Sequence, residues 1–251
     1  MPDLFQFSAI LQDFPRILAY LPVTLEISLI SIAFSWLLGF AVALVKINRI
    51  PVLRAVTAFY VSYMRGTPIL VQLYLSYYGV PIIFQYVNYY WGTHISINYF
   101  PKMIFVIIAF SLNEGAYASE TIRAALLSVD KGQTEAGLSI GMSKRQTFLS
   151  VVLPEALIVA VPSLGNQFIG LIKSTSLAFV CSVVEMTAEG QLVASSNFRF
   201  FEMYIALSLI YWAISILLSR GLILLEKKLK KSDREVKDNA EDYRAEEEVW
   251  Q

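Results

Sequence analysis

Glu114 is an acidic residue in the middle of a long apolar stretch, residues 101–125. A charged group at membrane depth costs roughly 2.5–3.5 kcal/mol on insertion scales, so a residue of this kind is a candidate for function. Tyr117 and Thr121 follow Glu114 at i+3 and i+7, which places all three on one face of a helix. The pattern predicts a polar face whose carboxylate can hold a cationic group by charge-assisted hydrogen bonds.

A second apolar stretch, residues 154–174, carries Asn166 and Gln167 near its middle and Lys173 near its end. A carboxylate and an ammonium group that face one cavity would suit the two charged ends of an amino acid. Two other interpretations stay open. Glu114 and Lys173 could pair with each other, or Lys173 could extend its charge to the membrane surface.

The sequence offers no comparable set of residues for catalysis or for metal binding. The chain has one histidine, His94, and one cysteine, Cys181, so we expect no disulfide, no metal site and no catalytic nucleophile–base pair. The segment GNQFIGLIKST resembles a phosphate-binding loop, but its lysine comes two residues late and no strand precedes it. We therefore expect no bound cofactor. A net charge of zero also predicts no nucleic-acid partner.

The composition indicates an all-α membrane protein. The chain of 251 residues is 56% hydrophobic and only 16% charged. Because a membrane-crossing helix needs about 20 mostly apolar residues, we expect about five transmembrane helices, near residues 20–45, 67–86 after a leading helix from 52, 101–125, 154–174 and 203–225. Residues 1–225 would form the transmembrane domain and residues 226–251 a charged tail that frays from a helix end.

The distribution of positive charge predicts the orientation. All but four of the 20 Lys and Arg residues fall on one side of such a five-helix arrangement, the exceptions being Arg16, Lys102, Lys173 and Arg199. Positive residues concentrate on the cytoplasmic side. The N-terminus is therefore expected outside and the C-terminus in the cytoplasm. Residues 176–200 are too short and polar to cross, and we expect short helices and loops there at the outer face.

The polar loop 131–154 is predicted to be a helix–glycine–helix hairpin in the cytoplasm. Residues 135–140 favour a helix that Gly141 ends, and Ser143 with Gln146 three residues later forms a capping box for a second helix. Pro154 would then start the next membrane span. A loop that lies on the membrane surface is the simpler alternative.

The spacing in this loop resembles the EAA loop of ABC importer permeases. Glu135, Ala136 and Gly137 are followed, after three residues, by Gly141 and, after nine more, by VVLP. The family most often has alanine where this chain has Gly137. The stretches RGTPILVQLYLSYYGVP, GAYASETIRAAL and PSLGNQFIGLIKSTSLA also resemble the branch of the family that takes up polar amino acids. Ser174 departs from the aspartate that many relatives carry.

This resemblance implies a MetI-like permease, the membrane-spanning subunit of an ATP-driven importer in a prokaryotic inner or plasma membrane. Its partners would be ABC ATPase subunits that bind the ATP, a second permease copy or homologue, an extracytoplasmic substrate-binding protein, an amino acid substrate and the lipid bilayer. The coupling residues would be Glu135, Ala136, Gly137, Gly141, Met142 and Ser143. The alternative is a secondary transporter or channel driven by an ion gradient, marked by activity without an ATPase partner.

The predicted orientation can be tested by labelling single cysteines in a Cys181→Ser background. A cysteine at Asn197 should react with a membrane-impermeant thiol reagent in intact cells, whereas one at Ser143 should react only after the cells are opened. Labelling of both positions from outside would contradict the five-helix arrangement.

Overall fold

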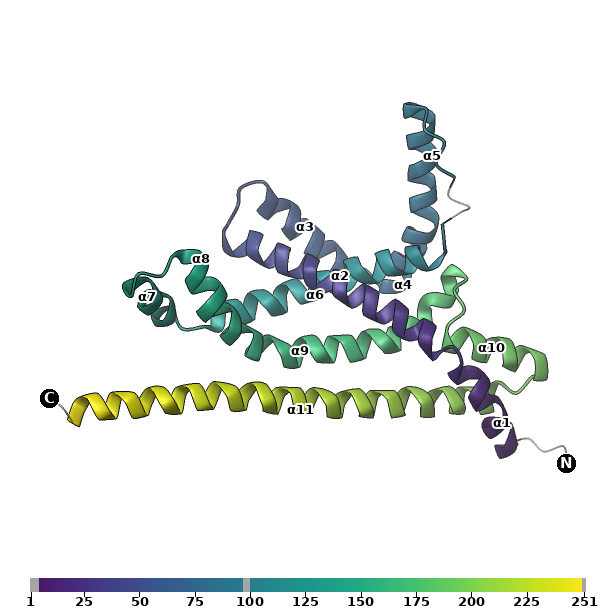
Figure 1. Ribbon diagram of the computed structural model, residues 1–251. Coiled ribbons are helices and arrows are strands. Elements are labelled where there is room, and N and C mark those ends of the chain that lie inside the picture. Colours follow the sequence, from purple (N-terminus) through teal and green to yellow (C-terminus); the bar gives the residue numbers. More distant parts are fainter. Residues whose placement is uncertain (1–4, 97–99, 250–251) are drawn as a thin grey trace. The chain divides into compact units, whose positions relative to one another are not determined.

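The computed structural model describes residues 5–96 and 100–249, and every regular element in this part of the chain is a helix (Figure 1). This confirms the predicted all-α class. Residues 1–4 and the predicted tail's residues 250–251 lie outside the described residues. The helices fall into two compact units, one made of residues 1–120 and 167–215 and the other of residues 121–166 and 216–251. We describe each unit by itself.

The first unit contains the N-terminal helices and the short helices between α9 and α11. Its helices are α1 (Phe7–Leu18), α2 (Leu21–Ile47), α3 (Leu53–Gly66), α4 (Ile69–Tyr74), α5 (Val80–Trp91), most of α6 (Met103–Ser128), the end of α9 (Leu153–Ser174), α10 (Met186–Asn197) and the start of α11 (Phe200–Val249). The second unit contains the rest of α6, α9 and α11 together with α7 (Lys131–Ser139) and α8 (Lys144–Thr147).

Three helical segments in the described residues are long and apolar enough to cross a membrane, namely Leu21–Ile47, Lys144–Cys181 and Phe200–Lys230. If the bent helix pair Leu53–Gly66 and Ile69–Trp91 is counted as one span, the number of candidate spans in the described residues rises to four. The predicted third span is present as α6, whose 26 residues would extend about 39 Å at 1.5 Å per residue. It carries Glu114, Glu120 and Arg123, which make it less apolar than the others. The number of five spans stays a prediction.

The predicted fourth apolar segment, residues 154–174, is present as α9, Leu153–Ser174, but Pro154 does not begin a separate helix. Residues Lys144–Cys181 form one helical segment of 38 residues, with a π-helical turn at Phe148–Val152 directly before α9. A proline has no N–H for the carbonyl four residues earlier, and a wider turn can accommodate that missing bond inside a continuous helix. The segment ends as a 3-10 helix, Thr175–Cys181. Short helices were predicted for residues 176–200, and this turn and α10 confirm them. Their place at the outer face stays a prediction.

The predicted fraying after residue 225 was wrong, because α11 continues as a helix to Val249. Its sequence explains this. Residues 226–249 are mostly glutamate, lysine, arginine, leucine and alanine, which are strong helix formers, and they place opposite charges four residues apart.

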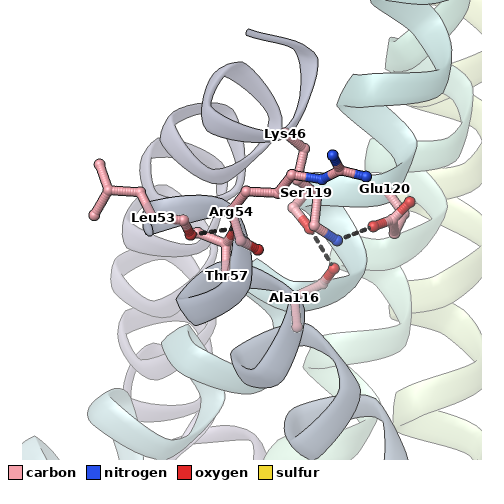
Figure 2. A network of polar contacts seen from close by, with 7 residues as sticks. All are labelled: Lys46, Leu53, Arg54, Thr57, Ala116, Ser119 and Glu120. Atoms are coloured by element: carbon pink, nitrogen blue, oxygen red, sulfur yellow. Dashed lines mark hydrogen bonds and ion pairs between the residues drawn. The ribbon is translucent and has the colours of Figure 1, made fainter. Parts of the chain in front are cut away.

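A close contact between α2 and α6 forms the centre of the first unit. A Cβ atom at Gly39 would lie 2.8 Å from the Cβ of Ala118 and 3.0 Å from the backbone nitrogen of Ser119, so only glycine allows this approach. Nearer the loop ends of the same helices, Lys46 of α2 forms an ion pair with Glu120 of α6. Figure 2 shows this pair.

A buried carboxylate is a second point of contact between helices of the same unit. Glu185 is fully buried, and its Oε1 accepts the backbone N–H groups of Thr187 (2.8 Å) and Ala188 (3.0 Å) as the N-cap of α10. Its Oε2 accepts the hydroxyls of Tyr211 of α11 (3.0 Å) and Thr24 of α2 (3.3 Å). Burial raises the pKa of Glu185, and these hydrogen bonds act in the opposite direction. One side chain thus joins three helices.

The α2–α6 approach predicts that Gly39→Val destabilises the protein. Overpacking of a rigid contact costs about 1–3 kcal/mol, so the melting temperature in detergent should fall measurably. Gly221→Val in α11 is the matched control, since a Cβ there would meet no described atom within 4 Å. Equal melting temperatures for the two variants would contradict the close packing at Gly39.

Candidate functional site

The first feature of the site is a break in a membrane helix. The sequence Arg65-Gly66-Thr67-Pro68 separates α3 from the helix that follows, and the two segments are bent by 111°. A residue before proline is pushed out of the α region, and Thr67 is extended with φ −118° and ψ 146°. Pro68 also lacks the N–H that would continue the helix. The break therefore follows from the local sequence.

Two buried amides satisfy the backbone at this break. Gln72 Nε2 donates to the carbonyl oxygens of Met64 (2.9 Å) and Thr67 (3.1 Å). Asn113 Nδ2 of α6 donates to the same Met64 oxygen (3.1 Å) and to Gln72 Oε1 (3.0 Å). Unpaired carbonyls in a membrane are costly, so this network fixes the end of α3 against the middle of α6.

A small cavity of about 210 Å³ lies beside the break. Tyr63, Gln72 and Ser76 contribute its polar groups, and the remaining lining is mainly aliphatic. The chain next to it forms a π-helical turn, Leu75–Gly79, in which Ser76 Oγ donates to the carbonyl of Phe105 (2.7 Å). Turns of this kind occur frequently at functional sites. Sequence reasoning did not identify these residues.

Glu114 and Gln167, both predicted site residues, are brought together by the fold. Gln167 Nε2 of α9 donates to Glu114 Oε2 (2.7 Å) and to the Glu114 carbonyl (2.6 Å). Within the described residues, the buried Gln167 Oε1 has no hydrogen-bond partner. Glu114 Oε1 likewise accepts no hydrogen bond from them. Two acceptor oxygens, one of them charged when the carboxyl is ionised, are thus without a hydrogen-bond partner in the described chain.

Two other predicted substrate residues of the same unit, Tyr117 and Lys173, form no hydrogen bond or ion pair with Glu114 or Gln167. Tyr117 is 42% exposed on α6, and the guanidinium carbon of Arg65 lies 5.3 Å from the centroid of its ring. Lys173 is exposed, and no carboxylate of the described chain lies within 4.0 Å of it, so the predicted alternative of a Glu114–Lys173 ion pair is not present. Thr121 and Asn166 belong to the second unit.

The predicted hairpin forms in the second unit, between α7 and α8. The first helix begins at Lys131, four residues earlier than expected, because Asp130 accepts the Gly132 N–H (2.6 Å) as its N-cap. Gly141 has φ +88°, which explains a glycine at the bend. The capping box is confirmed, with Gln146 N–H donating to Ser143 Oγ (3.3 Å) and Ser143 N–H to Gln146 Oε1 (2.9 Å).

One face of the hairpin is packed and the other is free. Gly137 is buried, and a Cβ there would lie 2.8 Å from Cγ2 of the buried Thr147 and 3.5 Å from the sulfur of Met142. Glu135 and Ala136 are exposed, and Ile140 at the tip is 80% exposed. The glycine at position 137 thus has a packing reason, and the opposite side presents a short helix with an apolar tip.

The comparisons with known proteins agree with this architecture. Residues 16–231 match the family described as "Binding-protein-dependent transport system inner membrane component". The chain is 42% identical to a probable amino-acid ABC transporter permease protein, PatM of Vibrio harveyi, over 91% of this chain and 98% of that protein. It is 39% identical to the L-cystine transport system permease protein TcyL of Bacillus subtilis (strain 168), with 94% of this chain and 96% of that protein covered.

A solved structure described as an amino acid ABC transporter with histidines is also similar. It has a TM-score of 0.75 and 30% sequence identity, and the match covers 89% of this chain and 99% of that one. The fold and the sequence define a helical membrane protein of the permease class. The chain belongs to the family of inner-membrane components of binding-protein-dependent transport systems. The predicted resemblance is confirmed, and the chain is a transport subunit, not an enzyme.

The packing of the hairpin predicts that Gly137→Val opens it, since the added side chain collides with Thr147. Trypsin should then cleave faster at Lys144 and Arg145 in the folded protein. Gln133→Val is the matched control, because Gln133 is exposed on the same helix. Unchanged cleavage in Gly137→Val would show that α7 does not depend on the contact with Thr147.

Proposed function

We propose that this chain is the membrane-spanning subunit of an ATP-driven importer for a polar amino acid. The relatives support the class of substrate, since the similar proteins carry the names of amino-acid and L-cystine permeases. The observation that carries the proposal within the structure is the Glu114–Gln167 pair. It joins α6 to α9 and leaves one oxygen of each side chain without a partner in the described chain.

An ammonium group is the chemical complement of these two acceptor oxygens, because it has three N–H donors and no acceptor. A half-buried carboxylate in a membrane helix is stabilised when such a partner is present. Tyr117, one turn further along α6, belongs to the proposed site as well. Thr121, Asn166 and Lys173 remain candidates by their positions in the sequence alone.

The hairpin α7–α8 is proposed as the contact with a separate ATPase subunit. Glu135 and Ala136 lie on its free side, whereas Gly137, Gly141, Met142 and Ser143 build its shape. A rigid short helix can transmit a displacement, because its backbone hydrogen bonds are made within the hairpin. The apolar, 80% exposed Ile140 provides a side chain for burial against the partner.

The remaining partners follow from the family. A second permease copy or homologue would complete the transport path, and an extracytoplasmic binding protein would deliver the amino acid. The assembly would lie in a prokaryotic inner or plasma membrane, with the N-terminus of this chain outside and its C-terminus in the cytoplasm. The alternative of a transporter driven by an ion gradient finds no support among the relatives.

The test is uptake by proteoliposomes that contain the chain, its ATPase partner and the binding protein, with radiolabelled L-cystine, L-glutamine and L-histidine as probes. Uptake of at least one probe should require ATP and should persist when ionophores remove the ion gradients. Uptake that follows an ion gradient without ATP would overturn the proposal.

In this assay, Glu114→Gln should keep the contact with Gln167, since an amide oxygen also accepts a hydrogen bond, but should lose the charge. Losing a charge-assisted hydrogen bond costs about 1.5–3 kcal/mol, so half-saturation should rise on the order of 10- to 150-fold. Basal ATPase activity should change little, because the hairpin is untouched. An unchanged half-saturation would place the substrate away from Glu114.

A further inference from the structure

Arg65 is an exposed cation beside the helix break of the first unit, and the proposed function does not yet use it. It lies next to Met64, whose carbonyl is held by Asn113, the eleventh residue of the 26-residue helix α6. At 1.5 Å per residue, Asn113 is about 15 Å from the start of α6. Arg65 is therefore level with the middle of a membrane helix and far from either end, where positive residues normally lie.

The end of its own helix does not need Arg65. A basic residue in the last turn of a helix often neutralises free carbonyls. Here other side chains do so. Thr67 Oγ1 donates to the Tyr63 carbonyl (2.9 Å), and Gln72 and Asn113 donate to the Met64 carbonyl. The carbonyl groups at the break therefore do not require the guanidinium group of Arg65 as a hydrogen-bond donor.

No carboxylate within the described residues neutralises Arg65 either, since none lies within 4.0 Å of its guanidinium nitrogens. Its contact is with the ring of Tyr117, at 5.3 Å, and both side chains are exposed on the isolated chain. A cation–π contact at an exposed site is weak, but it fixes the direction of a long side chain. An unneutralised cation at membrane depth must face water or an anion, because lipid would exclude it.

Tyr117 also fixes where Arg65 lies relative to Glu114. The two α6 residues are one turn apart, a rise of about 4.5 Å, and they share a helix face. Asn113, next to Glu114, holds the residue before Arg65. A cation from α3 therefore contacts the ring that follows the acid by one turn of α6, and one oxygen of that acid accepts no hydrogen bond from the described chain.

We propose that Arg65 binds the α-carboxylate of the transported amino acid, while Glu114 and Gln167 receive its ammonium group. This rests on the proposed function and replaces the role that sequence reasoning gave to Lys173. A planar guanidinium can donate two parallel hydrogen bonds to a carboxylate. The site then recognises the part that all α-amino acids share, and the side chain of the substrate is selected by other contacts.

The test is equilibrium binding to the complete complex of permease and ATPase in lipid nanodiscs, without the binding protein, so that only the membrane site is measured. The probes are radiolabelled L-cystine, L-glutamine and L-histidine, each competed with its own α-carboxamide, which keeps the ammonium group and removes the carboxylate charge. The variants are Arg65→Gln and Arg65→Lys, with Glu114→Gln as the matched variant at the other end of the ligand.

The wild-type complex should bind at least one amino acid on the order of 10- to 150-fold more tightly than its carboxamide. Arg65→Gln should weaken binding of the amino acid and leave binding of the carboxamide unchanged, so that the ratio approaches one. Arg65→Lys should lie between, because it keeps the charge but loses the paired donors. Glu114→Gln should weaken binding of the amino acid and of the carboxamide by the same factor, so that the ratio of the two affinities stays as in the wild type.

An unchanged ratio in Arg65→Gln and Arg65→Lys would overturn the proposal, even if both bind more weakly, because a merely structural arginine would affect the two ligands equally. A wild-type complex that does not distinguish the acid from the carboxamide would overturn it as well. Failure of the proposed function itself looks different, since ATP-driven uptake of every probe would then be missing in the wild type.

Discussion

A helix that breaks inside a membrane must still satisfy its backbone carbonyls, and the first unit of this protein depends on how it does so. The sequence RGTP ends α3, and lipid offers no donors to the freed carbonyl groups. Gln72 and Asn113 supply them from the following helix and from α6. Because one carbonyl, that of Met64, is shared by both amides, the break and the middle of α6 are held together. The polar residues of the candidate site lie around this point.

The same constraint explains why α6 can carry several ionisable residues. Helices approach it closely through small residues, since a Cβ at Gly39 of α2 would lie 2.8 Å from Ala118 and a Cβ at Gly115 would lie 3.0 Å from the hydroxyl of Tyr60. Close packing excludes lipid and lets partners reach the charges, as Lys46 does for Glu120 and Gln167 for Glu114 (Figure 2 shows the first pair). Polar groups in membrane proteins are tolerated when other helices satisfy them.

The hairpin shows how far local sequence reasoning reaches. Its bend at Gly141, its capping box and its helix–glycine–helix form are set by residues within a few positions of one another, so the sequence predicts them correctly. The start of α9 at Leu153 lies one residue from the predicted Pro154, but the helix already runs through the turn before it, and the end of α11 was predicted wrongly. Pro154 is normally a signal for a helix start and a charged segment a signal for fraying, but a π-helical turn and strong helix formers continue both helices.

By itself, the sequence determined the helical class, the approximate membrane segments, the hairpin and the likeness to ABC importer permeases, because apolar length, capping and motif spacing are local properties. It also identified Glu114 and Gln167 as polar residues in apolar segments. Only the tertiary structure decided that these two side chains meet, that Lys173 stays away from them and that Arg65 lies over Tyr117. From sequence alone, Arg65 counts as one of many positive charges near a helix end. Its position depends on the break after α3, which the local sequence sets, and on the depth at which Asn113 holds the preceding residue, Met64. That depth arises from a contact between residues about 50 positions apart.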